Sequence, residues 1–243
     1  MTKGILTGCN ERHEWMLKWW WKNYSTHNSY PVTFCDFGMS PSARMWCQTK
    51  GEVISQTAEM LPIKNLNEQV QDPPWKKHIA SYLWSHRPIW FLKPFAYKQT
   101  PYQRTLWLDI DCEIKGQLAP LIDLPLSSHG MGLTEYCQES TQKMRAKGII
   151  NPKAQCISSS VVVYEKDSVA LSAWIEYILQ YHPQELSEDT CFANLLAETP
   201  LDITQFPIHF NYNRHETPNP NALIYHHSGF QQKRKLLQTI TFN

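Results

Sequence analysis

The stretch TLWLDIDCEI, residues 105–114, decides the fold more clearly than any other part of the chain. Its first four residues are mostly large and apolar, and they run directly into Asp109 and Asp111. A short apolar run of this kind predicts a buried strand, and open α/β sheets bind their ligands at the C-terminal ends of such strands. Two carboxylates one residue apart at a strand end suit a single hard cation. The stretch therefore predicts a site for Mg²⁺ or Mn²⁺, which proteins commonly share with substrate phosphates.

Around this stretch, short apolar runs alternate with helical patterns. Further strands are predicted at 4–8, 30–34, 51–54 and 156–164, with short closing strands at 203–206 and 223–226. Helices are predicted at 13–27, 75–84, 89–97, 138–147, 168–181 and 189–197, and the proline-containing segment 61–75 is predicted to be a loop. Strands separated by helices favour βαβ units. We therefore expect an α/β fold with a mostly parallel central sheet flanked by helices.

The bulk composition limits the classes of function. The chain has 243 residues, enough for one large α/β domain, and we expect residues 1–243 to form it. Its 23 basic and 22 acidic residues give a net charge of +1. This balance offers no electrostatic reason to expect a nucleic-acid partner.

The cysteines and the apolar segments bear on location. Seven cysteines without a C-x-x-C pair are typical of reduced thiols, which predicts a cytoplasmic protein. The N-terminus lacks the apolar run of a signal peptide, and no stretch approaches the ~18 apolar residues of a transmembrane segment. The tryptophan-dense segment 15–21 is predicted to pack on the sheet, and peripheral membrane contact through it is the alternative.

The order of motifs along the chain resembles a known family. The Asp-x-Asp strand is followed by the apolar strand at 156–164, an acidic pair at a helix start, an Asn-bearing segment at 211–213, and His-x-x-Gly at 226–229. This series resembles the GT-A-fold glycosyltransferases, and in particular glycosyltransferase family 8, which includes glycogenin and bacterial galactosyltransferases. The resemblance spans residues 4 to about 235. It implies the GT-A (Rossmann-like) fold of nucleotide-diphospho-sugar transferases.

The resemblance also implies a set of metal ligands. Asp109 and Asp111 occupy the Asp-x-Asp motif that holds Mn²⁺ under the donor's diphosphate in such enzymes, and His226 matches the third ligand. A neutral imidazole completes a mixed oxygen and nitrogen coordination sphere suited to Mn²⁺. On a strand, His227 would point the opposite way from His226. A purely structural histidine pair is the alternative.

Two further matches carry open alternatives. Lys233 stands one residue later than the family's lysine, so that it either contacts a β-phosphate or belongs to a solvated basic tail. Glu188 and Asp189 stand where the family shows Asp-Gln, which makes them candidate catalytic residues that stabilise an oxocarbenium-like transition state or act as nucleophile or base. The same pair is also an ordinary acidic helix start, favoured by the helix dipole.

The nucleotide-sugar is expected to lie across several strand ends. The end of the first strand would meet the base, the residue after the second strand the base or ribose, cations upstream of the metal motif the phosphates, and small serines at 158–160 the sugar. The candidate contacts are Thr7, Cys9, Asn10, Asp36, Arg87, Lys93, Ser159, Gly229 and Lys233.

Together these observations favour a metal-dependent glycosyltransferase. The resemblance implies a nucleotide-diphosphate sugar donor, with a uridine nucleotide favoured, retention of the anomeric configuration, and a glycan, lipid or protein acceptor that the sequence does not identify. A nucleotidyltransferase is disfavoured because no glycine-rich, lysine-bearing phosphate loop follows the first strand. A non-catalytic sugar- or nucleotide-binding protein of the same fold is the second alternative.

Overall fold

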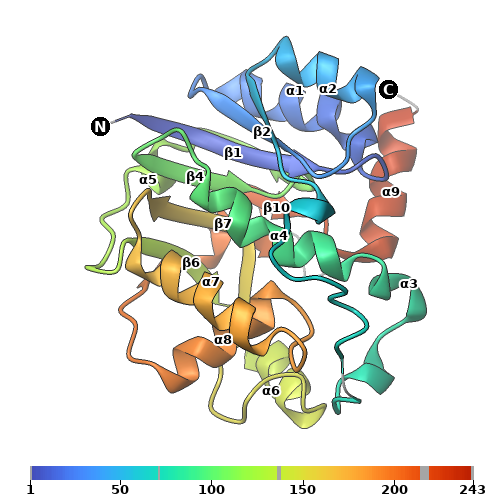
Figure 1. Cartoon of the computed structure of the whole chain (residues 1–243). Helices are drawn as coiled ribbons and strands as arrows, with labels where there is room; N and C mark the ends of the chain where they lie inside the picture. The colour runs from blue at the N-terminus through green and yellow to red at the C-terminus, as the bar shows by residue number, and fades with distance from the viewer. Residues whose placement is uncertain (1, 71, 136–137, 214–218, 242–243) are drawn as a thin grey trace.

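The protein is built on one large sheet, shown in Figure 1. The computed structural model describes residues 2–70, 72–135, 138–213 and 219–241. Seven strands lie in the order β3-β2-β1-β4-β7-β6-β8. Their bounds are β1 Lys3–Cys9, β2 Val32–Asp36, β3 Glu52–Ser55, β4 Arg104–Leu108, β6 Met131–Glu135, β7 Ile157–Glu165 and β8 Thr204–Gln205. Only β7 among them runs antiparallel to its neighbours, which confirms the predicted mostly parallel sheet.

A second, three-stranded sheet follows the end of β4. It consists of β5 (Cys112–Ile114), β10 (Ile224–His226) and β9 (Tyr212–Asn213), with β10 in the middle. The stretch that was predicted as one strand ending in two aspartates is therefore two strands in two sheets. The aspartates lie in the turn between them.

Helices flank the sheet. In Figure 1, α4, α7 and α8 lie together in front of it, whereas α1 and α2 lie beside β2 at the top. The principal helices are α1 Leu17–His27, α2 Pro41–Gln48, α4 Arg87–Lys98, α6 Gln138–Ala146, α7 Val169–Tyr181, α8 Glu188–Glu198 and α9 Gly229–Thr241. Two further helices are a single turn long, α3 at Ser81–Trp84 and α5 at Ala119–Ile122.

The predicted helices differ from the observed ones in several places, and the first of them, at 13–27, is a 3₁₀ turn followed by α1. The predicted helix at 75–84 is only a 3₁₀ turn, Lys76–His78, followed by α3, while α4 begins two residues before its prediction. Like α5 and α9, the short helix α2 has no counterpart among the predictions. It begins at Pro41 because Ser40 accepts a hydrogen bond from the amide of Ala43 and proline suits the first helical turn.

The core is continuous from β1 to α9 and includes tryptophans of the dense segment. Trp20 is completely buried, while Trp15, Trp19 and Trp21 are partly buried against the same core. The predicted packing of this segment on the protein interior is thus confirmed for Trp20. Within the described ranges, no helix combines the length and apolar character needed to cross a membrane.

Candidate active site

The turn between β4 and β5 presents the two aspartates at the end of the central sheet. The amide of Asp109 donates to the carbonyl of Ser160 on β7 at 2.8 Å, and the amide of Cys112 donates to the carbonyl of Asp109 at 3.0 Å. The indole of Trp107 donates to Asp109 Oδ1 at 2.7 Å. The first bond holds the turn against β7 and the other two fix its shape, so the carboxylates lie at the end of β4.

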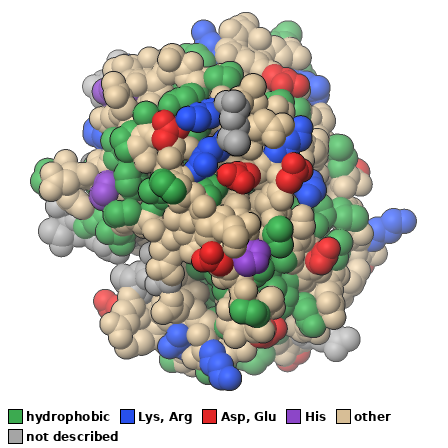
Figure 2. Space-filling model, turned by 90° about the vertical axis from the view of Figure 1, so that its left-hand side faces the viewer, with side chains coloured by type: hydrophobic (Ala, Val, Ile, Leu, Met, Phe, Trp, Pro, Cys, Tyr) green, Lys and Arg blue, Asp and Glu red, His purple; other side chains and the backbone are tan. Residues whose placement is uncertain are grey.

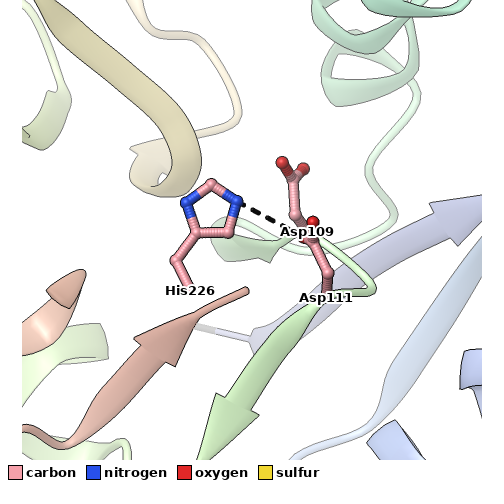
Figure 3. Close-up of side chains that lie close together, drawn as sticks. All are labelled: Asp109, Asp111 and His226. Atoms are coloured by element: carbon pink, nitrogen blue, oxygen red, sulfur yellow. Dashed lines mark ion pairs between the residues drawn. The ribbon is translucent and has the colours of Figure 1, made fainter. Parts of the chain in front are cut away.

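His226 reaches the same point from the far end of the chain, as Figure 3 shows. In the register of β5 with β10, His226 pairs with Cys112, which sets it beside Asp111. Its Nε2 lies 3.4 Å from Asp111 Oδ1, and one ligand atom from each of Asp109, Asp111 and His226 lies within 4.8 Å of the others. This mixed oxygen and nitrogen donor set fits a divalent ion such as Mn²⁺ or Mg²⁺.

Ser160 controls the orientation of this histidine. Its hydroxyl lies 3.0 Å from Nδ1 of His226, which leaves Nε2 directed at the carboxylates. Hydrogen bonds to the remote nitrogen commonly orient a ligand histidine. Ser160 was not predicted to be the partner of His226.

His227 points away from this cluster, as expected for neighbours on an extended chain. Its Nε2 lies 2.9 Å from Glu113 Oε2, and its ring packs edge-on against Trp19 at 5.7 Å. Burial raises the pKa of Glu113, but the hydrogen bonds from His227 and Lys115 outweigh it and lower that pKa to about 2. His227 therefore serves the packing of α1 against the small sheet.

Lys233 lies against the aspartate turn, so its side chain is not part of a solvated tail. It lies on α9 with Nζ 2.5 Å from Asp111 Oδ2, and its side chain is only 26% exposed. Burial disfavours its charge, but Asp111 holds its pKa above the ordinary value. Reciprocally, burial raises the pKa of Asp111, whereas Lys233 and His226 hold it well below the ordinary value.

A second cluster of charges surrounds Lys93 on α4. The lysine is 7% exposed, and its Nζ lies 3.0 Å from Asp109 Oδ1, 3.2 Å from Glu188 Oε1 and 2.9 Å from Ser159 Oγ. Burial opposes its charge, yet the surrounding carboxylates hold its pKa well above the ordinary value. Lys93 thus links Asp109, in the aspartate turn, to the acidic pair on α8.

The acidic pair begins α8, but it does not cap the helix. Ser187 caps it, in a reciprocal pair of hydrogen bonds with Thr190. The carboxylates instead meet β7, where Glu188 accepts from the hydroxyl of Ser159 at 3.0 Å and Asp189 from its amide at 2.9 Å. Both point away from the helix they begin. This geometry favours the functional interpretation over the ordinary helix start.

Burial controls the ionisation of these carboxyl groups. It raises the pKa of Glu188 to about 7, with Lys93 opposing and the neighbouring carboxylates reinforcing the shift. It also raises the pKa of Asp189, again against the influence of Lys93. Two acidic groups whose pKa values are displaced by burial beside a specific cation are typical of a functional site.

The two clusters line one cavity of about 270 Å³. Gly229 lies at its edge with φ of +80°, a left-handed conformation that lets the chain turn from β10 into α9. The cavity brings together most of the predicted residues, namely Lys93, Asp109, Asp111, Ser159, Glu188, Asp189, His226, Gly229 and Lys233.

A smaller depression of about 100 Å³ adjoins the cavity and contains the predicted Cys9 and Asn10. The two hollows share Trp90 and Lys93 from α4. Trp90 stacks on His86, with ring centroids 6.2 Å apart and planes at 19°. Flat aromatic rings of this kind suit stacking on a nucleobase.

His13 was missed by the sequence analysis and lines the same depression. Its Nδ1 lies 3.0 Å from Asn10 Oδ1, and burial together with nearby Lys233 lowers its pKa to about 4. The ring is therefore neutral and donates to Asn10. No motif or spacing in the sequence indicates a role for His13. His86, Trp90 and Lys93, by contrast, are four and three residues apart, a spacing that places them on one face of a helix.

Three residues that were predicted to contact the donor, Thr7, Asp36 and Arg87, do not line either hollow. Thr7 is completely buried within β1. Asp36 is used locally, because its Oδ1 accepts from the amides of Gly38 and Met39 and its Oδ2 pairs with Arg44 at 3.2 Å. Neither residue lines the cavity or the depression.

The expectation that Arg87 contacts phosphate is corrected. Its guanidinium is completely buried and donates to the carbonyls of Leu186, His182 and Glu185 at 2.9, 2.9 and 2.6 Å. Its remaining nitrogen donates to Asn67 at 3.0 Å. Arg87 therefore holds the loop before α8 and is turned away from the cavity.

The whole chain was compared with known proteins. No protein-family model and no curated protein sequence matches it. Solved structures do. The galactosyltransferase LgtC in complex with donor and acceptor sugar analogues superposes with a TM-score of 0.63 at 14% identity, covering 93% of this chain and 87% of LgtC.

Two other glycosyltransferases show the same likeness. GlyE of Streptococcus pneumoniae has a TM-score of 0.59 at 14% identity, over 93% of this chain and 55% of GlyE. Mouse xyloside xylosyltransferase 1 has a TM-score of 0.56 at 14% identity, over 92% of this chain and 97% of that enzyme. At these identities the likeness concerns the fold, and the fold of this chain is that of the GT-A glycosyltransferases.

Proposed function

We propose that the chain is a metal-dependent glycosyltransferase that uses a nucleotide-diphosphate sugar. The observation that carries the proposal is one cavity in a GT-A fold lined by both a metal-ligand triad, Asp109, Asp111 and His226, and an acidic pair, Glu188 and Asp189. A protein that only binds a nucleotide sugar would need the metal-ligand triad but not the acidic pair. The structure of LgtC with donor and acceptor sugar analogues supports the same class of substrates.

The donor follows from the arrangement of the two hollows. Its base lies in the depression at the end of β1, beside Asn10 and the stacked rings of α4, and a uridine nucleotide is favoured. Its diphosphate lies at the triad, where the ammonium of Lys233, which pairs with Asp111 in the structure, adds positive charge for a phosphate oxygen. Its sugar lies over Ser159 and the acidic pair.

The transfer exchanges one bond at the anomeric carbon for another. The bond to the diphosphate breaks, a bond to an acceptor hydroxyl oxygen forms, and the hydroxyl proton leaves with the diphosphate. When bound, Mn²⁺ or Mg²⁺ supplies Lewis-acid stabilisation of the leaving diphosphate. Asp109, Asp111 and His226 hold it, and Lys233 adds positive charge on the same side.

The acidic pair acts on the sugar. As the glycosidic bond breaks, positive charge grows at the anomeric carbon, and the carboxylates of Glu188 and Asp189 stabilise it. Lys93 pairs with Glu188 and donates to the hydroxyl of Ser159, while the amide of Ser159 holds Asp189. We further propose that the reaction retains the anomeric configuration and that the chain is a member of glycosyltransferase family 8. Residues 1–243 would act as one domain, in the cytoplasm. Among the described cysteines, all six are free thiols, in keeping with that location.

Nucleotide binding tests the donor site. We expect UDP to bind more tightly than GDP in calorimetry, and to require Mn²⁺. Asp111→Asn should weaken Mn²⁺-dependent UDP binding by at least about 100-fold, because even partners of metal ligands contribute 10- to 100-fold. Glu113→Gln is the matched control two residues away, because Glu113 faces His227 instead of the cavity. Equal UDP affinity in wild type and Asp111→Asn would remove the metal site from the proposal.

Turnover tests the acidic pair separately. Asp189→Asn should lower UDP release from the preferred UDP-sugar by about 100-fold, as expected when one group that stabilises transition-state charge is lost. Its UDP affinity and melting temperature should stay close to wild type, because Ser187 caps the helix. Wild-type turnover in Asp189→Asn would leave a nucleotide-binding protein without this catalytic pair.

A further inference from the structure

A second cavity, of about 320 Å³, adjoins the start of α8. It lies between α6, the first residues of β7 and the buried side of α8. In Figure 1, α6 and α8 are neighbours in the lower part of the molecule. It shares Ser187 and Asp189 with the cavity of the proposed active site. The two cavities therefore meet at a carboxylate that we assign to catalysis.

The walls of this second cavity are apolar, in contrast to the charged walls of the first. They are formed by Met144, Ile150, Cys156, Ile157 and Ala193. All but Met144 are less than 5% exposed, which makes this a preformed apolar surface. Pockets of roughly 300 Å³ or more with such a lining are typical of small-ligand sites.

The polar groups around the second cavity already have partners. Lys143 pairs with Glu139 at 2.6 Å, and the hydroxyl of Thr190 donates to the carbonyl of Ser187 at 2.9 Å. A bound sugar ring would lose the hydration of several hydroxyl groups here and gain few hydrogen bonds in return. An aliphatic or aromatic group carries no hydroxyl groups, so it loses no such hydration when it enters the cavity.

We propose that this cavity is a subsite for the acceptor and that it holds an alkyl or aryl group of the acceptor next to the reacting hydroxyl. The inference rests on the proposed function, because it takes Asp189 as the point where donor sugar and acceptor meet. Because the configuration is retained, the acceptor hydroxyl approaches the anomeric carbon from the face that the diphosphate leaves. The alkyl or aryl substituent of the acceptor then extends past Asp189 into the apolar cavity.

The expected gain in affinity follows from burial of apolar surface. Each buried methylene group favours binding by about fourfold. An acceptor with an octyl tail should therefore bind at least tenfold more tightly than the same head group with a methyl tail, even when only part of the tail enters.

Calorimetry with two simple glycosides tests this. Octyl β-D-glucoside, below the concentration at which it forms micelles, and methyl β-D-glucoside are titrated into the protein in the presence of UDP and Mn²⁺. We expect the octyl compound to bind at least tenfold more tightly. Ser140→Phe, which places a ring at the cavity wall on α6, should remove most of that preference. Gln142→Phe carries the same ring on an exposed position of α6 and should keep it.

UDP affinity measured on the same samples separates this inference from the proposed function. If UDP and Mn²⁺ bind as proposed but the two glycosides bind equally or not at all, the subsite is overturned while the donor site stands. If the octyl preference survives in Ser140→Phe, the tail binds elsewhere and the subsite is again overturned. Absence of UDP binding with an octyl preference that Ser140→Phe removes would instead overturn the donor site and leave an apolar ligand site.

Discussion

Two cations on the same helix, Arg87 and Lys93, are both buried and have opposite kinds of partner. Arg87 donates only to neutral oxygens, mostly backbone carbonyls of the segment before α8. Lys93, less than two turns further along α4, pairs with the carboxylates of Asp109 and Glu188. Burial lowers the pKa of Arg87 to about 10, whereas the carboxylates around Lys93 hold its pKa well above the ordinary value.

The difference separates a structural cation from a functional one. A guanidinium that donates to several carbonyls holds a loop in place, and its hydrogen bonds do not depend on the charge of neighbouring groups. An ammonium between two acidic groups responds to whatever charge arrives beside them, including that of a phosphate or of a developing cation. The same helix therefore supports the cavity at one end and takes part in its electrostatics at the other.

Replacing the structural cation should have the largest effect. Arg87→Met leaves three backbone carbonyls without their donor, and a buried acceptor that loses its partner costs about 1–3 kcal/mol. We expect the free energy of unfolding to fall by about 3–5 kcal/mol in chemical denaturation, with UDP affinity of the folded protein unchanged. Arg44→Met is the control, because its ion pair with Asp36 is half exposed and should contribute less than about 1 kcal/mol. A loss as small as that of the control would contradict the structural role of Arg87.

Replacing the functional cation should act on catalysis instead. Lys93→Met leaves Glu188 and Asp109 without the charge that holds them, and we expect UDP release from the sugar donor to slow by about 100-fold, equivalent to about 2.7 kcal/mol. The loss of stability should be smaller than for Arg87→Met, because Glu188 can take up a proton when its partner is gone. Lys98→Met, at the exposed end of α4, is the control. Equal rates in the two variants would show that Lys93 has no part in the reaction.

The comparison also shows how far sequence reasoning reaches. The Asp-x-Asp turn was predictable because an apolar strand and its terminal carboxylates are adjacent in the chain. His226 was predictable from a local motif, and the register of β5 with β10 brings it to the aspartates. Arg87 and Lys93, by contrast, were the same kind of candidate in the sequence. Their roles depend on which segment packs over each of them, and that is decided by contacts some 100 residues away.

The same reason explains the residues that were missed. Ser160 faces His226 because β7 runs beside β4 in the opposite direction, a pairing that has no signature in the serine triplet itself. The apolar cavity beside Asp189 needs α6, β7 and α8 to meet, and each contributes residues that read as ordinary core. Local chemistry is visible in the sequence, whereas the side chains that orient it are visible only in the packing.

The smallest of the expected effects is a pH dependence centred on the acidic partner of Lys93. With the pKa of Glu188 raised to about 7, the ionised fraction falls as the pH falls below neutrality. If the carboxylate form stabilises the transition state, the rate of UDP release should fall about tenfold for each pH unit below 7, which is about 1.4 kcal/mol per unit, and level off above it. Glu188→Gln should be slower than wild type and flat across this range. A parallel decline in Glu188→Gln would assign the titration to another group.

Stability should move in the opposite direction, which makes the assignment sharper. The unfolded chain releases the Glu188 proton near the ordinary value of 4.5, whereas the folded protein keeps it up to about 7. Between these values the folded state binds more protons, so the contribution of Glu188 to the free energy of unfolding falls as the pH rises. Wild type should therefore lose stability relative to Glu188→Gln over the interval in which it gains activity. A loss of stability together with a gain of activity is expected of a buried carboxyl group that acts in its charged form. Arg87→Met should leave both pH dependences unchanged, because the guanidinium does not contact Glu188.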